Sequence, residues 1–234
     1  MITTVLFDLD GTLLPMDMDE FTNGYFKLLA GKMAGHGFEP EALMKGIYKG
    51  MAAMAKNNGT QTNEEAFWQS FCGVFGEKVR EKEEAFIDFY KNEFNLAKKC
   101  CGFTEKAKKV IDILKEKEIG RVLATNPIFP EIATRNRIAW AGLSPADFSY
   151  ISVYENSTYA KPNPAYFEEV LKKCSLNPNE CIMIGNDAEE DLAAQEVGIP
   201  VFLLTDCLVN TKGKDISRCR KGNFDDLIKL VEEL

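Results

Sequence analysis

The feature that most constrains this chain is a short apolar segment at its start. A long helical region separates it from the other short apolar segments of the chain. Residues 5–7 are Val, Leu and Phe, and they run directly into Asp8-Leu9-Asp10-Gly11-Thr12. A short apolar run closed by Asp and Gly is typical of a buried strand that ends in a loop. We expect this strand to belong with the strands that follow later in the chain.

The segment that follows is helical in pattern and contains no strand. The expected helices span residues 19–34, 40–56 and 77–96, with a further helix capped by Asn63, and each carries apolar residues at helical spacing. Four amphipathic helices without a strand between them are typical of a small bundle. We therefore expect this block to fold as a unit of its own.

After Gly102 the pattern changes to an alternation of short apolar segments and helices. The expected strands are residues 121–125, 149–153, 181–184 and 200–204, and the expected helices are residues 104–117, 131–141, 164–174, 188–197 and 224–234. Such alternation indicates βαβ units, in which a parallel sheet is covered by helices on both faces. The sequence therefore predicts an α/β fold: a doubly wound, Rossmann-like parallel-sheet core of residues 1–15 and 97–234, with an inserted α-helical cap of residues 16–96.

Composition and charge disfavour several classes of function. The net charge is −8 and Lys and Arg form no long run, so nucleic acid is not an expected partner. No stretch approaches the ~18 to 20 uninterrupted apolar residues that cross a bilayer, and the N-terminus lacks the pattern of a signal peptide. Seven cysteines is an odd number at irregular spacings, which suits free thiols in a reducing compartment. We expect a cytoplasmic protein that binds neither nucleic acid nor membrane.

The single histidine narrows the chemistry further. A Ser-His-Asp triad or a multi-histidine zinc site would have to depend on His36. That residue lies between two glycines, where a surface or capping histidine is the plainer interpretation. Catalysis must then rest on carboxylates, hydroxyls and lysines.

Polar side chains follow the expected strands, and functional groups of a parallel sheet gather at the carboxyl ends of its strands. These ends carry Asp8 and Asp10, Thr125 and Asn126, Lys161 a few residues beyond a strand, and Asn186 and Asp187. Neighbouring carboxylates repel each other, so this cluster favours a hard cation such as Mg²⁺. The lysine and the hydroxyl suit an anion, and the whole combination suits a phosphoryl group.

Each of these residue types also has a purely structural interpretation. Aspartates can end a strand or begin a turn, a β-branched threonine suits a strand, and a lysine before a proline suits an exposed loop. Asn186 and Asp187 could cap the next helix, with Asp191 an acid of its first turn. The functional interpretation is favoured because the groups converge on one edge of the sheet.

The motifs at these strand ends resemble those of the haloacid dehalogenase (HAD) superfamily. Residues 8–13, DLDGTL, are similar to its opening motif, Thr125 in VLATN to its second, Lys161 in AKPNPAYF to its third, and residues 184–191, IGNDAEED, to its fourth, acidic motif. The motifs occur in the expected order. The helical block between the first two resembles the family's type-1 cap.

The resemblance implies a Mg²⁺-dependent phosphohydrolase. Asp8 would be the nucleophile that forms a phosphoaspartate, and Asp10 would be the general acid and base. Thr125 and the Asn126 amide would hold phosphate oxygens, and Lys161 would neutralise Asp8 and the phosphate together. The haloacid-dehalogenating branch of the family lacks the second aspartate of the opening motif, so Asp10 favours phosphate chemistry.

The resemblance also implies a Mg²⁺ site made by the Asp8 carboxylate, the Asp10 backbone carbonyl and an acid of the fourth motif. Relatives often have Gly-Asp where this chain has Gly-Asn, with Asp187 one place later. We expect Asp187 to be the ligand because a carboxylate binds Mg²⁺ better than an amide does. Asn186 is the alternative, and Asp191 would support the site without binding the metal.

By the same resemblance, the cap closes over the site, excludes bulk water and reads the non-phosphate part of a small phosphorylated metabolite. The hinges would lie near residues 15–19 and 98–102. Sugar phosphates, phosphoglycolate and nucleotides all stay open as substrates, and the sequence does not indicate an oligomeric state.

Two other functions also stay open. One is a phosphomutase with the same nucleophile. The other is a receiver-like phosphoryl-binding signalling module that is not an enzyme, although receiver domains are shorter and have no helical insertion after the first strand.

Overall fold

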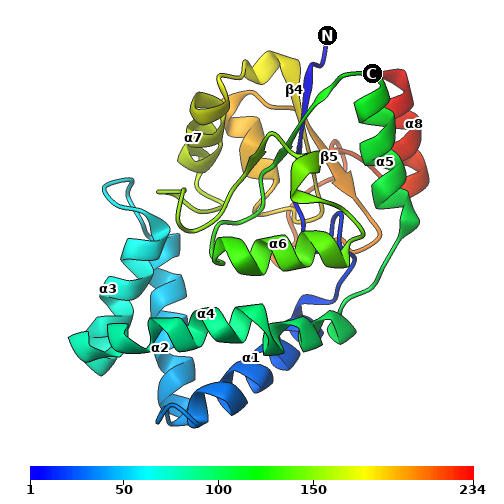
Figure 1. Cartoon of the computed structure of the whole chain (residues 1–234). Helices are drawn as coiled ribbons and strands as arrows, with labels where there is room; N and C mark the ends of the chain where they lie inside the picture. Colours follow the sequence, from blue (N-terminus) through cyan, green and yellow to red (C-terminus); the bar gives the residue numbers. More distant parts are fainter.

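A six-stranded parallel sheet organises the core of the computed structural model, which describes all 234 residues (Figure 1). Its strands are β1 (Thr4–Phe7), β2 (Gly120–Leu123), β3 (Tyr150–Ile151), β4 (Cys181–Gly185), β5 (Val201–Leu204) and β6 (Arg220–Gly222). They lie in the order β3-β2-β1-β4-β5-β6, and every neighbouring pair is parallel. The direction of winding reverses between β1 and β4, and this switch point is where ligands bind in open α/β sheets.

Both faces of the sheet are buried, because alternate strand residues enter different hydrophobic clusters. On β1, Val5 and Phe7 belong to one cluster and Leu6 to the other. The first cluster includes residues of α5 (Glu105–Glu116), α6 (Glu131–Trp140) and α8 (Phe224–Glu233), and the second includes α7 (Pro164–Cys174) and the short 3-10 helix η5 (Leu192–Val197). The predicted doubly wound α/β core is confirmed.

A helical cap lies below the carboxyl ends of the strands (Figure 1). Its helices are α1 (Met18–Ala34), α2 (Pro40–Ala55), α3 (Asn63–Phe75) and α4 (Glu83–Lys91), with the 3-10 helices η1 (Glu77–Lys82) and η2 (Glu93–Cys100). The two segments that join cap and core run side by side, and Gly102 N donates to Pro15 O at 2.7 Å. Rings also pack across the boundary, as Phe94 and Trp140 do with centroids 5.0 Å apart.

The prediction of one continuous helix over residues 77–96 is wrong. It is broken into η1, α4 and η2, and the second break falls at Asn92, whose backbone angles are not helical. The Asn92 side chain donates to both the backbone oxygen and the carboxylate of Asp88. Asparagine competes in this way with the hydrogen bonds of a helix interior, which explains the break.

Other predicted elements are shorter than expected. The strands expected over 121–125 and 149–153 end at Leu123 and Ile151. The helix expected over 188–197 is a turn over residues 188–191 followed by η5. Strand β6 was not predicted, because it is an Arg-Lys-Gly segment with two exposed residues and no apolar pattern. The N-cap of α3 is Thr62, in a capping box with Glu65, and not Asn63.

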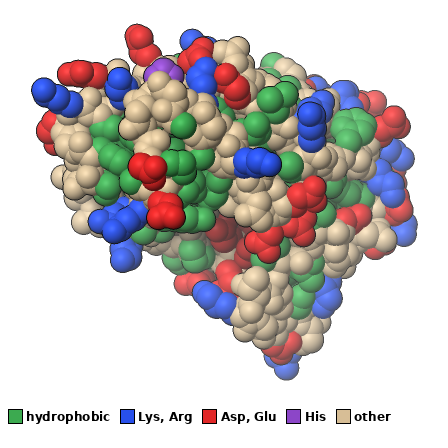
Figure 2. Space-filling model, turned by 90° about the horizontal axis from the view of Figure 1, so that it is seen from below, with side chains coloured by type: hydrophobic (Ala, Val, Ile, Leu, Met, Phe, Trp, Pro, Cys, Tyr) green, Lys and Arg blue, Asp and Glu red, His purple; other side chains and the backbone are tan.

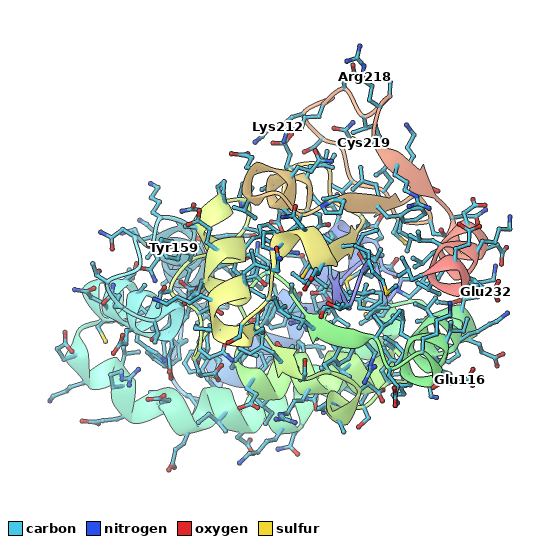
Figure 3. All side chains as sticks on the ribbon, turned by 90° about the horizontal axis from the view of Figure 1, so that it is seen from above. Glu116, Tyr159, Lys212, Arg218, Cys219 and Glu232 are labelled. Carbon is cyan, nitrogen blue, oxygen red and sulfur yellow. The ribbon has the colours of Figure 1, made fainter.

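The segment between β5 and β6 projects from the body, and it carries Lys212, Arg218 and Cys219 (Figure 3). At another edge, α5 and α8 pack together, and Lys117 Nζ donates to Glu232 O at 2.6 Å. Two short 3-10 helices, η3 (Pro145–Asp147) and η4 (Pro178–Glu180), precede β3 and β4. None of the helices combines the length and the apolar character that crossing a bilayer requires.

Candidate active site

The loop after β1 turns sharply at the switch point. Asp8 N donates to Ile184 O of β4, and Leu14 N donates back to Leu9 O, so the loop closes on itself. Gly11 has a φ of +80°, and a Cβ atom there would lie 2.3 Å from Asn186 Nδ2. Only glycine allows both this backbone conformation and this approach of the fourth motif.

The structure brings the predicted site residues together. A pocket of about 120 Å³ is lined by Asp8, Asp10, Thr125, Asn126, Asn186, Asp187 and Asp191, together with Glu190 and a few apolar residues. Lys161 reaches the same place from the loop before α7, because its ammonium contacts Asp8. Seen from below, the molecule is hollowed, and acidic side chains lie inside the hollow (Figure 2).

Lys161 holds two carboxylates at once. Its Nζ lies 3.0 Å from Asp8 Oδ1 and 2.6 Å from Asp191 Oδ1, and the residue is only 2% exposed. Burial by itself lowers the pKa of Lys161, but Asp191 and Asp8 outweigh it and hold the pKa well above its ordinary value. Lys161 is therefore a fixed positive charge beside Asp8 and not an exposed loop lysine.

Asp8 is held in an environment that opposes its charge. Burial is the largest cause, the Lys161 charge opposes it, and Asp191 and Asp10 add repulsion, so that the pKa of Asp8 rises to about 7. An additional cation near Asp8 would favour its ionised form.

In the fourth motif, neighbouring side chains have different partners. Asn186 is buried, its Oδ1 accepts from Thr12 Oγ1 at 2.8 Å, and the same hydroxyl lies 3.4 Å from Asp8 Oδ2. Asp187 Oδ1 instead accepts from two backbone amides of the following turn, at 2.6 and 2.9 Å. Asn186 is thus linked to Asp8 through the Thr12 hydroxyl, while one oxygen of Asp187 caps the turn.

Asp191, the last residue of the fourth motif, contacts both Asp187 and Lys161. Its Oδ2 accepts from Asp187 N at 2.9 Å, and its Oδ1 binds Lys161. A Cβ atom on Gly185 would lie 2.1 Å from Asp191 Oδ2, so the carboxylate packs directly against the end of β4. The expected role of Asp191, to support the site without binding the metal, stays a prediction.

Arg137 is a site residue that the sequence did not indicate as one. It lies on α6 with no exposed surface, and its guanidinium forms an ion pair with Asp10 Oδ2. The same group donates to Thr134 Oγ1 at 3.2 Å and stacks over the Phe129 ring at 4.2 Å. The available signal was an arginine four residues after Ala133 on the apolar face of the helix, where a charge needs a buried partner.

Glu190 is the second residue that the sequence missed. Its Oε1 accepts from Asn126 Nδ2 at 2.8 Å, and burial is the main cause that raises the pKa of Glu190 to about 8. Thr125 is buried at the end of the second motif, and its backbone oxygen accepts from Tyr166 Oη at 2.9 Å. These contacts orient Asn126 and Thr125 at the wall of the pocket.

The donor set of this pocket suits a hard cation. All the candidate ligands are oxygens, and Asp10 Oδ1 and Asn126 Oδ1 are buried without a hydrogen-bond partner. No three Asp, Glu, His or Cys side chains converge closely enough to hold a metal alone. A cation here would therefore also need backbone or amide oxygens, such as the Asp10 carbonyl and Asn186 Oδ1.

Solved structures of similar fold cover almost the whole chain. A HAD phosphatase from Thermococcus onnurineus matches with a TM-score of 0.60, 16% identity and 98% coverage of both chains. L-2-haloacid dehalogenase from Xanthobacter autotrophicus matches with a TM-score of 0.59, 15% identity and full coverage of both chains. CbbY from Rhodobacter sphaeroides, solved in complex with phosphate, matches with a TM-score of 0.59, 16% identity and coverage of 97% of this chain and 96% of that one.

At these identities the structural similarity establishes the fold and not the reaction. A search of curated protein sequences gave no match. The sequence profile of the haloacid dehalogenase-like hydrolases, however, matches residues 2–198, a range that contains all four motifs and the cap. The chain belongs to the haloacid dehalogenase-like hydrolase family.

Proposed function

We propose that this protein is a Mg²⁺-dependent phosphatase that acts on a small phosphorylated metabolite through a phosphoaspartate on Asp8. The observation that carries the proposal is the buried contact of Asp8 with Lys161 at the switch point of the sheet, with Asp10 in the same pocket. Both a phosphatase and a dehalogenase have this fold, but a departing alcohol needs a proton, which Asp10 can supply, whereas a departing halide needs none.

In the proposed reaction, one oxygen of Asp8 attacks phosphorus in line with the bond to the substrate oxygen. That bond breaks, and Asp10 donates its proton to the departing alcohol. Asp10 then takes a proton from a water molecule, which attacks the phosphoaspartate and releases phosphate. Lys161 and Thr125 would hold the phosphoryl oxygens during both steps.

The residues of the pocket fit a bound Mg²⁺. Asp8, the Asp10 carbonyl and the fourth motif would hold it, and it would supply positive charge that screens the phosphate from the Asp8 carboxylate. The sequence favoured Asp187 as the fourth-motif ligand, but the contacts support Asn186, because its amide oxygen contacts the same Thr12 hydroxyl as the Asp8 carboxylate does. Asp187 already caps a turn.

The cap would exclude bulk water and contact the non-phosphate part of the substrate, with hinges at residues 15–19 and 98–102. The paired linkers at Pro15 and Gly102 support this division of the chain into a core of residues 1–15 and 97–234 and a cap of residues 16–96. A reducing, cytoplasmic location fits seven cysteines that form no disulfide.

Replacing the nucleophile tests the proposal. Asp8→Asn keeps the shape of the side chain but removes the attacking charge, so hydrolysis of para-nitrophenyl phosphate should fall by roughly 10³-fold or more. The matched control is Asp19→Asn, an exposed carboxylate of the cap, which should leave the rate unchanged.

Both variants should keep their far-ultraviolet circular dichroism. Substantial turnover by a folded Asp8→Asn protein would refute the nucleophile assignment. Release of free phosphate, rather than its return to the substrate at another position, separates hydrolysis from a mutase reaction.

A further inference from the structure

A second cavity lies next to the catalytic pocket, between the cap and the core. It has a volume of about 100 Å³, and fourteen of its sixteen lining residues are hydrophobic. Most of these residues are aromatic, and none carries a charge. Met18, Ile128 and Phe129 line both this cavity and the catalytic pocket, so the two spaces adjoin. Hydrophobic side chains also gather beside the hollow that holds the acids (Figure 2).

The walls of this cavity come from both parts of the molecule. Thr22 and Trp68 belong to cap helices α1 and α3, whereas Phe129 belongs to the core loop before α6. A packing gap within the bundle would be lined by cap residues alone. The cavity instead forms where the cap meets the core. It lies next to the pocket where the phosphoryl group would bind.

The cavity offers very few polar groups to a ligand. The hydroxyls of Tyr25 and Tyr90 are 2.8 Å apart and satisfy each other. The Trp68 indole N–H is buried and has no hydrogen-bond partner. Besides this indole N–H, the hydroxyls of Thr22 and Tyr154 are the other polar side-chain groups of the lining. So few groups cannot satisfy all the hydroxyls of a sugar, or the ring nitrogens and ribose of a nucleotide, and such groups are costly to bury unpaired.

We propose that this cavity binds the leaving group of the substrate, and that the substrate is a phosphomonoester of an uncharged aromatic or arylalkyl alcohol. The proposal rests on the phosphatase function proposed above and names its substrate class. The phosphoryl group would lie at Asp8, while the ring passes Met18 and Phe129 into the cavity. Dry apolar cavities of this kind bind aromatic rings, and offset or edge-to-face contacts with the lining rings add to the burial of apolar area.

Three esters of primary alcohols test the substrate class: 2-phenylethyl phosphate, ethyl phosphate and glucose 6-phosphate. Each releases a primary alcohol, so differences in kcat/KM report the side group rather than the leaving-group chemistry. We expect kcat/KM for 2-phenylethyl phosphate to exceed both others by roughly tenfold to 10²-fold. A preference for glucose 6-phosphate or ethyl phosphate would overturn the proposal.

A pair of substitutions on α1 connects this preference to the cavity. Thr22→Phe adds a ring to the cavity wall, and Asn23→Phe adds the same ring on the exposed side of the helix. Thr22→Phe should lower kcat/KM for 2-phenylethyl phosphate by roughly tenfold and change ethyl phosphate hydrolysis by less than about threefold. Asn23→Phe should change neither. Equal losses for both esters in Thr22→Phe would refute the assignment.

A binding measurement separates this proposal from the phosphatase function. Titration with 2-phenylethanol should shift the fluorescence emission of Trp68 in the unmodified protein. The shift should be weak or absent in Thr22→Phe. It should be absent in Trp68→Phe, which keeps only Trp140. Binding without turnover of any ester would reject the phosphatase and keep the apolar site. Turnover of ethyl phosphate without 2-phenylethanol binding would reject the apolar site and keep the phosphatase.

Discussion

At the scale of single residues, the site consists of buried charges that depend on one another. Lys161 is shared by Asp8 and Asp191, and Arg137 pairs with Asp10. Removing one member of such a pair leaves its partner buried and uncompensated, which is costly to the folded state. A substitution here therefore needs a stability measurement beside the kinetic one.

The fourth motif gives a prediction at this scale. If Asn186 Oδ1 is a metal ligand, Asn186→Ala should raise the Mg²⁺ concentration for half-maximal activity by roughly tenfold or more. Asp187→Ala should mainly remove a turn cap and lower stability by ~1 kcal/mol. Titration of activity with Mg²⁺ in both variants, with urea unfolding beside it, decides between them. A larger Mg²⁺ requirement in Asp187→Ala would make Asp187 the ligand, as the sequence suggested.

Arg137 gives a second prediction. It holds Asp10 Oδ2 while stacked on Phe129, so it should position the proton donor for the departing alcohol. Arg137→Met should lower kcat by ~10- to 10²-fold with little change in KM, and Arg137→Lys should recover only part of it, because lysine lacks the planar guanidinium fork. Steady-state kinetics of both folded variants test this. An increase in KM at unchanged kcat would assign Arg137 to substrate binding instead.

At the scale of elements, the N-terminus of α3 joins the cap to the core. Asn63 is fully buried, and its Nδ2 donates to Pro127 O at 3.1 Å and to Tyr159 O at 3.0 Å. Two backbone amides of the same turn, Asn63 N and Glu64 N, donate to core oxygens at 2.8 and 2.9 Å. This turn is one of the polar contacts that hold the cap against the core.

Two neighbouring substitutions separate docking from helix capping. Asn63→Ala leaves two core oxygens without their partner and should lower stability by about 1–3 kcal/mol and speed hydrogen exchange at residues 63 and 64. Thr62→Ala removes the helix cap alone, costs about 1 kcal/mol, and should leave those two amides protected. Urea unfolding and amide exchange measure both effects. Equal exchange rates in the two variants would show that Asn63 does not dock the cap.

At the scale of the whole molecule, the sheet gathers carboxylates at one edge of a protein that is already acidic. The net charge is −8, and the pKa of Asp8 is raised to about 7 by burial and by neighbouring acids. The folded, metal-free protein therefore holds a proton near Asp8 that the unfolded chain releases near its ordinary value of 3.8.

This linkage predicts a pH dependence with a definite sign. Because protons compete with Mg²⁺ for Asp8, the half-saturating Mg²⁺ concentration should fall by up to about tenfold per pH unit toward pH 7 and level off above it. Without Mg²⁺, the raised pKa of Asp8 stabilises the folded state. This stabilisation is complete below the pKa of Asp8 in the unfolded chain and is lost as the pH rises through about 7.

Activity titrations and urea unfolding between pH 5 and 8 measure both trends. In Asp8→Asn the unfolding curve should depend less on pH across this window. A Mg²⁺ requirement that stays constant from pH 5 to 7 would contradict the raised pKa of Asp8.

Hydrophobic patterning was enough to predict the sheet core and the helical block after β1, because a strand buried on both faces is an apolar run and a helix buried on one face is amphipathic. That this block closes over the site as a cap stays a prediction. The grouping of Asp8, Asp10, Thr125 and Lys161 was also predictable, since they follow strands whose ends must meet in a parallel sheet. Their catalytic roles stay predictions. Short exposed elements were not predictable in this way. Strand β6 has no apolar residue, and it pairs only because β5 presents a free edge.

Tertiary structure alone decided which groups became partners across long distances in the chain. Arg137 meets Asp10 across 127 positions, Asn63 reaches Tyr159 across 96, and Thr12 meets Asn186 across 174. No local pattern encodes such pairs, because their energies depend on burial that exists only once the layers have packed. The sequence by itself therefore determined most of the elements and their order, while packing decided the charge partners, the contacts of the fourth-motif side chains and the apolar cavity beside the acids.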